Sequence, residues 1–157
     1  MNSLLTFLKL NQGWNAEPNA PAPVVSVDGN DVILRFYLNA FRYPDFSEEE
    51  FGYLRFVTCE RYRLGSTNDE GWYRGQCRFG KLAPEWGEFY QISGNFAGVA
   101  EATDWHLLST TSSSKLRHFL FYFRDNTFEC LAVECVVEQR TDNALLRKLT
   151  SIPTLDK

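Results

Sequence analysis

The feature that most constrains the fold is the apolar stretch 116–137, which reads LRHFLFYFRDNTFECLAVECVV. Its one polar interruption is the tetrad at positions 124–127. Two hydrophobic runs separated by so short a break predict two β-strands joined by a tight turn, which we place at Asp125-Asn126. The stretch therefore predicts a β-hairpin at the centre of the fold.

The predicted turn fixes which side chains share each face of this hairpin. One face carries aromatic and small apolar residues, closed at its far end by an ion pair. Its predicted cross-strand pairs are Phe123 with Phe128, Phe121 with Cys130, Phe119 with Ala132, and Arg117 with Glu134. The other face mixes Leu120, Leu131 and Val133 with polar residues, and is too apolar for open water. We therefore expect the hairpin to be covered, at least in part, on both sides.

Alternating apolar and polar residues recur along the rest of the chain and predict further strands. A second hairpin is expected over Val24–Leu38, with its turn at 28–31 and with Val25, Val27, Val32, Leu34 and Phe36 on one face. Other strands are expected over 51–64, 72–79, 88–93 and 103–108. Fifteen per cent of the residues are aromatic, which also favours strands over helices.

Helical patterns occur only near the two ends. Ser3 is a candidate cap for a helix through Leu10, and Thr141 or Asp142 for a helix that stops before Pro153. About eight short strands with terminal helices predict an all-β fold, an antiparallel sandwich or barrel. The alternative is an α+β fold in which the terminal helices pack on one curved antiparallel sheet.

Size and charge limit the class of protein. The 157 residues predict a single globular domain, 1–157. A net charge of −4 disfavours nucleic acid as a partner. With no signal peptide or membrane span recognisable, we expect a cytoplasmic protein that does not insert into membranes. Oligomeric state cannot be inferred.

The four cysteines give no metal or redox motif. They lack C-x-x-C spacing, and strand alternation places Cys130 and Cys135 on opposite faces, so we expect all four to be reduced. The sequence predicts no metal site and no cofactor, although a calcium site at Asp28, Asn30 and Asp31 is an alternative to their role in a turn. The acidic group 45–50 is interpreted as a solvated loop in which Ser47 and Glu50 have capping-box spacing.

A basic strand face is the main candidate binding site. Between positions 55 and 81 the local charge is +3, although the whole chain carries −4. Planar guanidinium groups bind carboxylates or phosphates in a bidentate manner, and a neighbouring indole adds stacking. The alternative is a solvated face neutralised by nearby carboxylates. The candidate residues are Arg55, Arg61, Arg63, Trp72, Arg74, Gln76 and Arg78.

The polar residues of the central hairpin are the second candidate site. His118, Tyr122 and Glu129 share the mixed face, and the predicted turn makes Tyr122 and Glu129 direct neighbours. If that face lines a cavity, these side chains would orient a polar ligand. A weaker alternative is an enzyme that uses His118, or His106 with Asp104, in acid–base chemistry.

These observations favour a non-enzymatic binding module that engages a protein partner or an anionic small molecule through the basic strand face described above, which we call the Arg/Trp face. The alternative is a small-ligand-binding β-barrel whose cavity is lined by His118, Tyr122 and Glu129.

Overall fold

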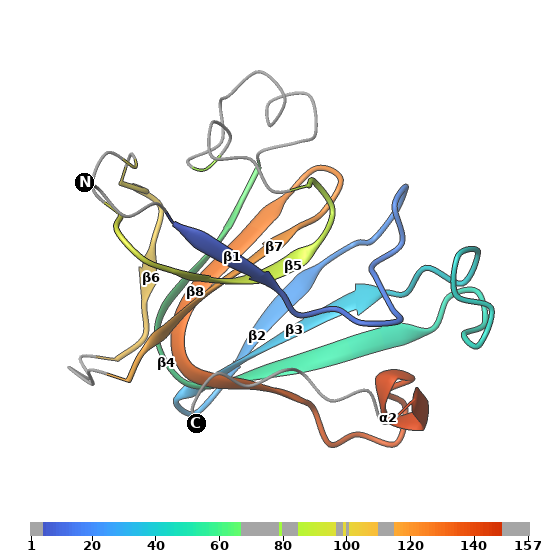
Figure 1. Cartoon of the computed structure of the whole chain (residues 1–157). Helices are drawn as coiled ribbons and strands as arrows, with labels where there is room; N and C mark the ends of the chain where they lie inside the picture. Colours follow the sequence, from blue (N-terminus) through green and yellow to red (C-terminus); the bar gives the residue numbers. More distant parts are fainter. Residues whose placement is uncertain are drawn as a thin grey trace.

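The strands form one antiparallel sheet, which confirms the all-β prediction. The structure is a computed structural model and describes residues 5–66, 79, 85–96, 99, 101–109 and 115–148. Its strands are β1 (Thr6–Lys9), β2 (Val24–Asp28), β3 (Asp31–Tyr37), β4 (Phe51–Gly65), β5 (Phe89–Ser93), β6 (His106–Leu107), β7 (Arg117–Tyr122) and β8 (Thr127–Val137). Their order in the sheet is β1-β5-β7-β8-β4-β3-β2, and β6 pairs with β4 outside this order (Figure 1).

The sheet curves strongly without closing into a barrel. Phe56 on β4 contacts Phe89 on β5 at 6.1 Å between ring centroids, although β8 and β7 lie between these two strands in the sheet. Only a curved sheet brings side chains from such separated strands together. In the part of the chain that the structure describes, β1 and β2 are the two edges and do not pair with each other. The architecture is a single curved sheet instead of a sandwich or a closed barrel.

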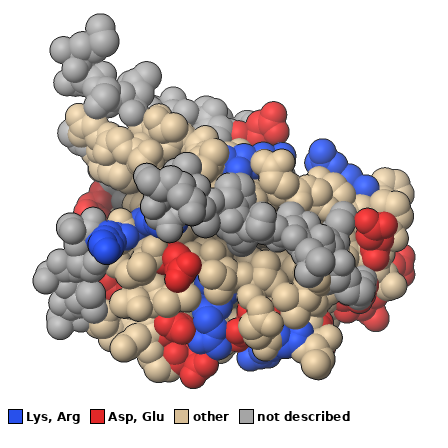
Figure 2. Space-filling view, turned by 60° about the horizontal axis from the view of Figure 1, so that its bottom comes forward, with Lys and Arg blue, Asp and Glu red and all other residues tan. Residues whose placement is uncertain are grey.

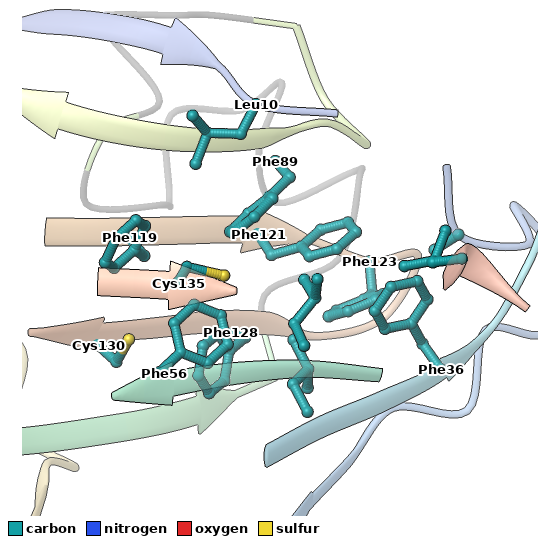
Figure 3. Packing of buried hydrophobic residues seen from close by; sticks show 14 of the residues in the cluster. Leu10, Phe36, Phe56, Phe89, Phe119, Phe121, Phe123, Phe128, Cys130 and Cys135 are labelled. Carbon is teal, nitrogen blue, oxygen red and sulfur yellow. The ribbon is translucent and has the colours of Figure 1, made fainter. Parts of the chain in front are cut away.

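Apolar side chains cover both faces of this sheet, as predicted for the central hairpin. One face carries the larger cluster, in which the rings of Phe36, Phe56, Phe89, Phe121 and Phe128 converge (Figure 3). We call it the inner face. The opposite face, which we call the outer face, carries a smaller cluster made of Phe79, Tyr90, Ile92, Leu120 and Tyr122.

The β7–β8 hairpin exists, but its register differs from the predicted one by two residues. Phe121 pairs with Phe128 and Tyr122 with Thr127, so positions 123–126 form a four-residue loop closed by a hydrogen bond from Phe123 N to Asn126 O (2.8 Å). A two-residue primed turn needs positive φ, and neither Asp125 nor Asn126 has it. Because the shift is an even number of residues, the side chains from Arg117 to Ala132 keep their predicted faces.

A break in the alternation of β4 and β8 places Cys59 on the inner face, whereas strict alternation predicts it on the same face as Arg55 and Arg61. The pairing of these strands shifts by one residue between Cys59 and Arg61, and Thr58 has a φ of 50°. Thr58 N donates to Asp31 Oδ1 (2.9 Å), which holds this backbone conformation. The alternation of β8 also changes here, so Cys130 and Cys135 both point into the inner cluster and not to opposite faces (Figure 3).

The second predicted hairpin is confirmed. β2 and β3 pair with Val27 opposite Val32 and Val25 opposite Leu34, as the alternation indicated. Gly29 takes a φ of 62° in the turn, a conformation that glycine adopts without steric cost. The predicted strands over 51–64 and 88–93 correspond to β4 and β5, and the one over 103–108 is reduced to β6.

The prediction of helices at both ends is not supported. Residues Thr6–Lys9 form β1, which pairs with β5, because Phe7 packs against the outer cluster while Leu8 packs against the inner one. A strand whose two faces are both buried has consecutive apolar residues, and in sequence such a run can be mistaken for the apolar side of a helix. At the other end the structure describes one helical turn, α2 (Leu145–Lys148). Its cap is Asn143, whose Oδ1 accepts from Leu145 N (3.1 Å), and not Thr141 or Asp142.

Candidate functional site

A row of side chains crosses the outer face of the sheet from β4 to β5. Because neighbouring strands in the sheet are antiparallel, residues that pair directly share a face. Arg61 on β4 pairs with Leu131 on β8, which pairs with His118 on β7, and this residue pairs with Ile92 on β5. The register therefore brings a basic side chain of β4 and the histidine of the central hairpin to one region of the outer face.

A pocket of about 460 Å³ opens along this row. We call it the outer pocket. Its wall combines charged groups with rings and includes Arg61, Phe96, Trp105, Arg117, His118 and Leu131. A concave site that combines apolar walls with a few polar groups is typical of small-molecule binding. The pocket therefore lies on the outside of the sheet and not inside a barrel.

Aromatic rings position the imidazole of His118. Phe96 stacks on it at 4.9 Å between centroids with an interplanar angle of 8°. Phe79 meets it edge-on at 5.9 Å, and the indole of Trp105 lies 6.5 Å away. These contacts hold the ring in a single orientation, with one face covered by Phe96.

The outer face also holds a chain of charged groups that begins at His118. His118 Nε2 contacts Glu129 Oε2, and Arg63 Nη1 donates to the other oxygen of Glu129 (3.2 Å). Arg63 Nε donates in turn to Asp104 Oδ1 (2.6 Å). Glu129 is fully buried, whereas the Asp104 side chain is half-exposed. These charged side chains thus link the buried carboxylate of Glu129 to the solvent-exposed Asp104 through the guanidinium group of Arg63.

Arg63 and Asp104 shift each other's pKa values. Burial by itself would lower the pKa of Arg63, but its hydrogen bond with Asp104 and the negative charge of Glu129 raise that pKa above the usual value. The hydrogen bond from Arg63 holds the pKa of Asp104 below its usual value, against the opposing effect of burial. Arg63 and Asp104 therefore stay charged near neutral pH.

Arg61 lines the outer pocket beside Trp105. Its guanidinium carbon lies 4.7 Å from the centre of the Trp105 ring, a cation–π contact. Glu60 forms an ion pair with its Nε at 3.4 Å, but without hydrogen-bond geometry. The Nε is buried and has no hydrogen-bond acceptor in the part of the chain that the structure describes. A buried donor of this kind is costly unless an acceptor satisfies it.

Arg55 lies at the other end of β4 in a site of its own. It donates to Glu138 through Nε (2.9 Å) and Nη2 (2.8 Å), and to Asp31 (2.7 Å) and Asp28 (2.9 Å). The hydrogen bonds with Glu138, Asp28 and Asp31 raise the pKa of Arg55 above its usual value. On the face drawn in Figure 2, basic side chains likewise lie beside acidic ones. The two aspartates proposed as alternative calcium ligands thus serve as partners of an arginine.

The residues of the predicted Arg/Trp face divide into three groups. Arg55 is bound by carboxylates, Arg63 belongs to the chain that ends at Asp104, and Arg61 lines the outer pocket. All three keep the outer side of β4, but the structure does not bring them to one site. The other predicted members, Trp72, Arg74, Gln76 and Arg78, lie outside the described residues.

The second predicted site is brought together only in part. His118 and Glu129 are in contact, but Tyr122 pairs with Thr127 and its ring lies 4.7 Å from that of Trp86. The two-residue difference in register moves Tyr122 away from Glu129. Asp104 and His106, the other candidate pair, also have different partners, since Asp104 binds Arg63 and His106 stacks on Tyr62 at 5.2 Å.

Sequence reasoning missed the residues that complete the outer pocket. Phe96 lies in a glycine-bearing segment without alternation, and nothing local connects it to His118. Trp105 was recognisable only as one of several tryptophans. The pairing of β4 with β8 and of β8 with β7 brings Arg61 close to His118, and this pairing is known only from the fold.

The described residues contain no group of three or more His, Cys, Asp or Glu side chains able to hold a metal ion. Within the same ranges, no helix has the length and apolar character that crossing a membrane requires. No family model matches the sequence, and no similar protein was found among curated proteins or solved structures.

Proposed function

We propose that the protein is a binding module that takes up a small anionic ligand with a flat ring in the outer pocket. The observation that carries this proposal is Arg61, which lines the pocket and lies over the Trp105 ring. An anionic group pairs with the guanidinium group of Arg61, and a ring extends the existing stack of aromatic side chains.

The charges of the pocket wall support an anion over a cation. Arg61 and Arg117 contribute two positive charges, and Glu101 contributes one negative charge. Glu101 Oε1 already accepts from Trp105 Nε1 (3.2 Å) and Ala102 N (3.2 Å). Arginine binds carboxylate and phosphate oxygens with charge-assisted hydrogen bonds, which are stronger than neutral ones. The pocket is therefore suited to a ligand with at least one such group.

The rings of Phe96, His118 and Trp105 support a flat ligand. Phe96 and His118 stack at 4.9 Å, and Trp105 lies edge-on to His118. His118 Nε2 is bound to Glu129, so Nδ1 is the ring nitrogen left for a hydrogen bond with a ligand. The role we assign to His118 is orientation of the ligand, which fits a binding module better than an acid–base enzyme.

This proposal combines the two expectations drawn from the sequence. It keeps the anionic ligand expected for the Arg/Trp face, but places it in a pocket on the outer face next to His118. Arg55 and Arg63 already bind carboxylates by hydrogen bonds, and Arg61 is the described arginine of that face that lines the outer pocket.

Matched probes test the proposal directly. We would titrate the protein with 2-naphthoate and with 2-naphthol, which share a ring system but differ in charge, and follow binding by calorimetry and NMR. We expect saturable binding of 2-naphthoate only, with resonances of Trp105 and His118 shifted. Losing the Arg61 contact in Arg61→Gln should weaken binding at least about tenfold, since one charge-assisted hydrogen bond is worth about 1.5–3 kcal/mol.

Arg35→Gln is the matched control. Arg35 also lies over an aromatic ring, that of Phe51 at 4.4 Å, and also has a buried Nε without a hydrogen-bond partner among the described residues, but it does not line the outer pocket. Its substitution changes the net charge equally and should leave 2-naphthoate binding unchanged. Equal binding of both probes, or an equal effect of both substitutions, would overturn the proposal.

A further inference from the structure

A second pocket, of about 670 Å³, lies at the opposite end of the molecule from the outer pocket. It is formed by the segment that links β3 to β4 together with part of the connector before β2. In Figure 1 the β3–β4 segment projects on the right, far from β6 on the left. The residues that matter for its chemistry are Glu17, Tyr37, Phe41, Phe46, Glu48 and Glu49, and we call it the acidic pocket.

Phe41 is 97% exposed at the edge of this pocket. Burying a phenylalanine side chain stabilises a complex by about 1.5–3 kcal/mol, so a phenyl ring held in water is a strong contact point for a partner. Other large apolar side chains exposed in the described ranges, such as Val27 at 46%, retain more cover. The exposure of Phe41 is therefore a distinctive feature of this surface.

Hydrogen bonds hold the segment that carries Phe41 in a defined conformation. Asn39 is buried, its Oδ1 accepts from Arg42 N (3.0 Å), and its carbonyl accepts from Tyr43 N (3.1 Å). Phe46, which is 3% exposed, anchors the other side of the loop in the inner cluster. The ring of Phe41 is thus presented by an ordered turn, which lowers the entropy lost when a partner binds.

Three glutamates make the pocket negative. Glu17, Glu48 and Glu49 line it, and its described lining contains no basic side chain. The nearest arginine in sequence, Arg42, turns to the ring of Tyr43 at 5.2 Å instead. Glu50 also stays out of the lining, because its carboxylate accepts from Ser47 N (2.6 Å) in the predicted capping interaction. The acidic run therefore directs negative charge to the pocket.

Carboxylates beside aromatic faces bind guanidinium and ammonium groups, by ion pairing and by cation–π contact. A small cation would fill the pocket but leave Phe41 in water, whereas a polypeptide would cover both. We propose that the acidic pocket docks a partner protein through a segment in which an arginine or lysine stands next to an apolar side chain. The basic side chain enters between the glutamates while its apolar neighbour covers Phe41. This inference is independent of the ligand proposed for the outer pocket.

A peptide library displayed on phage provides a probe whose chemistry is not chosen in advance. We would select it on the intact wild-type protein, then synthesise the most enriched peptides and measure their affinity by fluorescence anisotropy. We expect enriched sequences that pair arginine or lysine with an aromatic or aliphatic residue. Their binding should weaken as ionic strength rises, because salt screens exposed charges.

Matched variants assign the binding to this pocket. Phe41→Ser should weaken the selected peptides at least tenfold, and Glu48→Gln combined with Glu49→Gln should reduce both affinity and salt dependence. The controls are Val27→Ser, which removes another exposed apolar side chain, and Asp125→Asn combined with Glu134→Gln, which removes two exposed charges elsewhere. The controls should bind as the wild type does.

Four results would overturn the proposal. They are a library that yields no binder, selected peptides that are acidic or uncharged, binding that survives Phe41→Ser, and concentration-dependent dimers in sedimentation that Phe41→Ser abolishes. The last result would identify a second copy of this chain as the occupant.

Discussion

Glu129 contacts His118 diagonally across the β7–β8 hairpin, although the two residues are not paired. Glu129 lies opposite Leu120 and His118 lies opposite Leu131, so the imidazole reaches along the outer face to the carboxylate. The carboxylate is fully buried and is bound by this histidine and by Arg63. A buried charge is costly unless it is paired, so its environment is sensitive to the loss of either partner.

Replacing Glu129 by leucine should lower the free energy of unfolding by about 3 kcal/mol, because the mostly buried guanidinium of Arg63 then keeps only Asp104 as a partner among the described residues. Urea unfolding at neutral pH, followed by tryptophan fluorescence, measures this change. Asp104→Asn is the control, since its side chain is half-exposed and an exposed pair contributes less than about 1 kcal/mol. Equal losses in the two variants would show that burial of Glu129 does not set the cost.

Stability should depend on acid through Arg55 and Glu138. The hydrogen bond from Arg55 is the largest influence on Glu138 and holds the pKa of this carboxyl below its usual value of 4.5. A carboxyl whose pKa is lower in the folded state stabilises the fold above its unfolded pKa, and this contribution disappears as pH falls through the folded pKa. The wild type should therefore exceed Arg55→Gln in stability at neutral pH.

The measurement is the difference in unfolding free energy between these two proteins from neutral pH to about pH 3. At that pH, carboxyl groups with ordinary pKa values become protonated. We expect the difference to shrink as pH falls below 4.5, the ordinary value for this carboxyl. Arg124→Gln serves as the control, because Arg124 Nη1 binds the carbonyl oxygen of Asn19, which does not titrate. A difference that is independent of pH would contradict the proposed coupling.

The faces of the central hairpin were predictable, but its register was not. Alternation assigns each side chain to a face, and a shift by two residues preserves that assignment. Phe119, Phe121 and Phe128 therefore point inward in both registers. The contact between His118 and Glu129 depends on the actual register, which is set by the backbone of the loop at 123–126 and not by the apolar pattern.

Two further features lay outside what local patterns can indicate. Cys59 turns inward because Asp31, on a neighbouring strand, binds the backbone of Thr58. Phe96 reaches His118 from a segment with no period of its own. Both depend on contacts between residues far apart in sequence, and such contacts become visible only when the strand order is known.

Thr58 should be a site where glycine stabilises the protein. Its φ of 50° is strained for a β-branched residue, at a cost of about 1–3 kcal/mol, part of which glycine regains after its own entropy loss. Thr58→Gly should raise the free energy of unfolding by about 0.5–1 kcal/mol, because Asp31 still accepts from the backbone amide. Val57→Gly, at the adjacent position without positive φ, should instead destabilise by about 1 kcal/mol. A lower free energy of unfolding in both variants would show that the backbone at Thr58 is not strained.

The core thiols should react only when the protein unfolds. Cys59, Cys130 and Cys135 are free thiols and buried, and burial is the main cause that raises the pKa of Cys130 and of Cys135 well above the usual value of 9.0. Because the thiolate is the reactive form, both burial and the raised pKa slow reaction with a disulfide reagent. The fourth cysteine, Cys77, is replaced by serine so that only the core thiols report, and their labelling at pH 8 should then follow the unfolding rate across a urea series. Ser26→Cys, on the exposed strand β2, adds a control thiol that should label at once, and equally fast labelling of the core thiols would contradict their burial in the folded state.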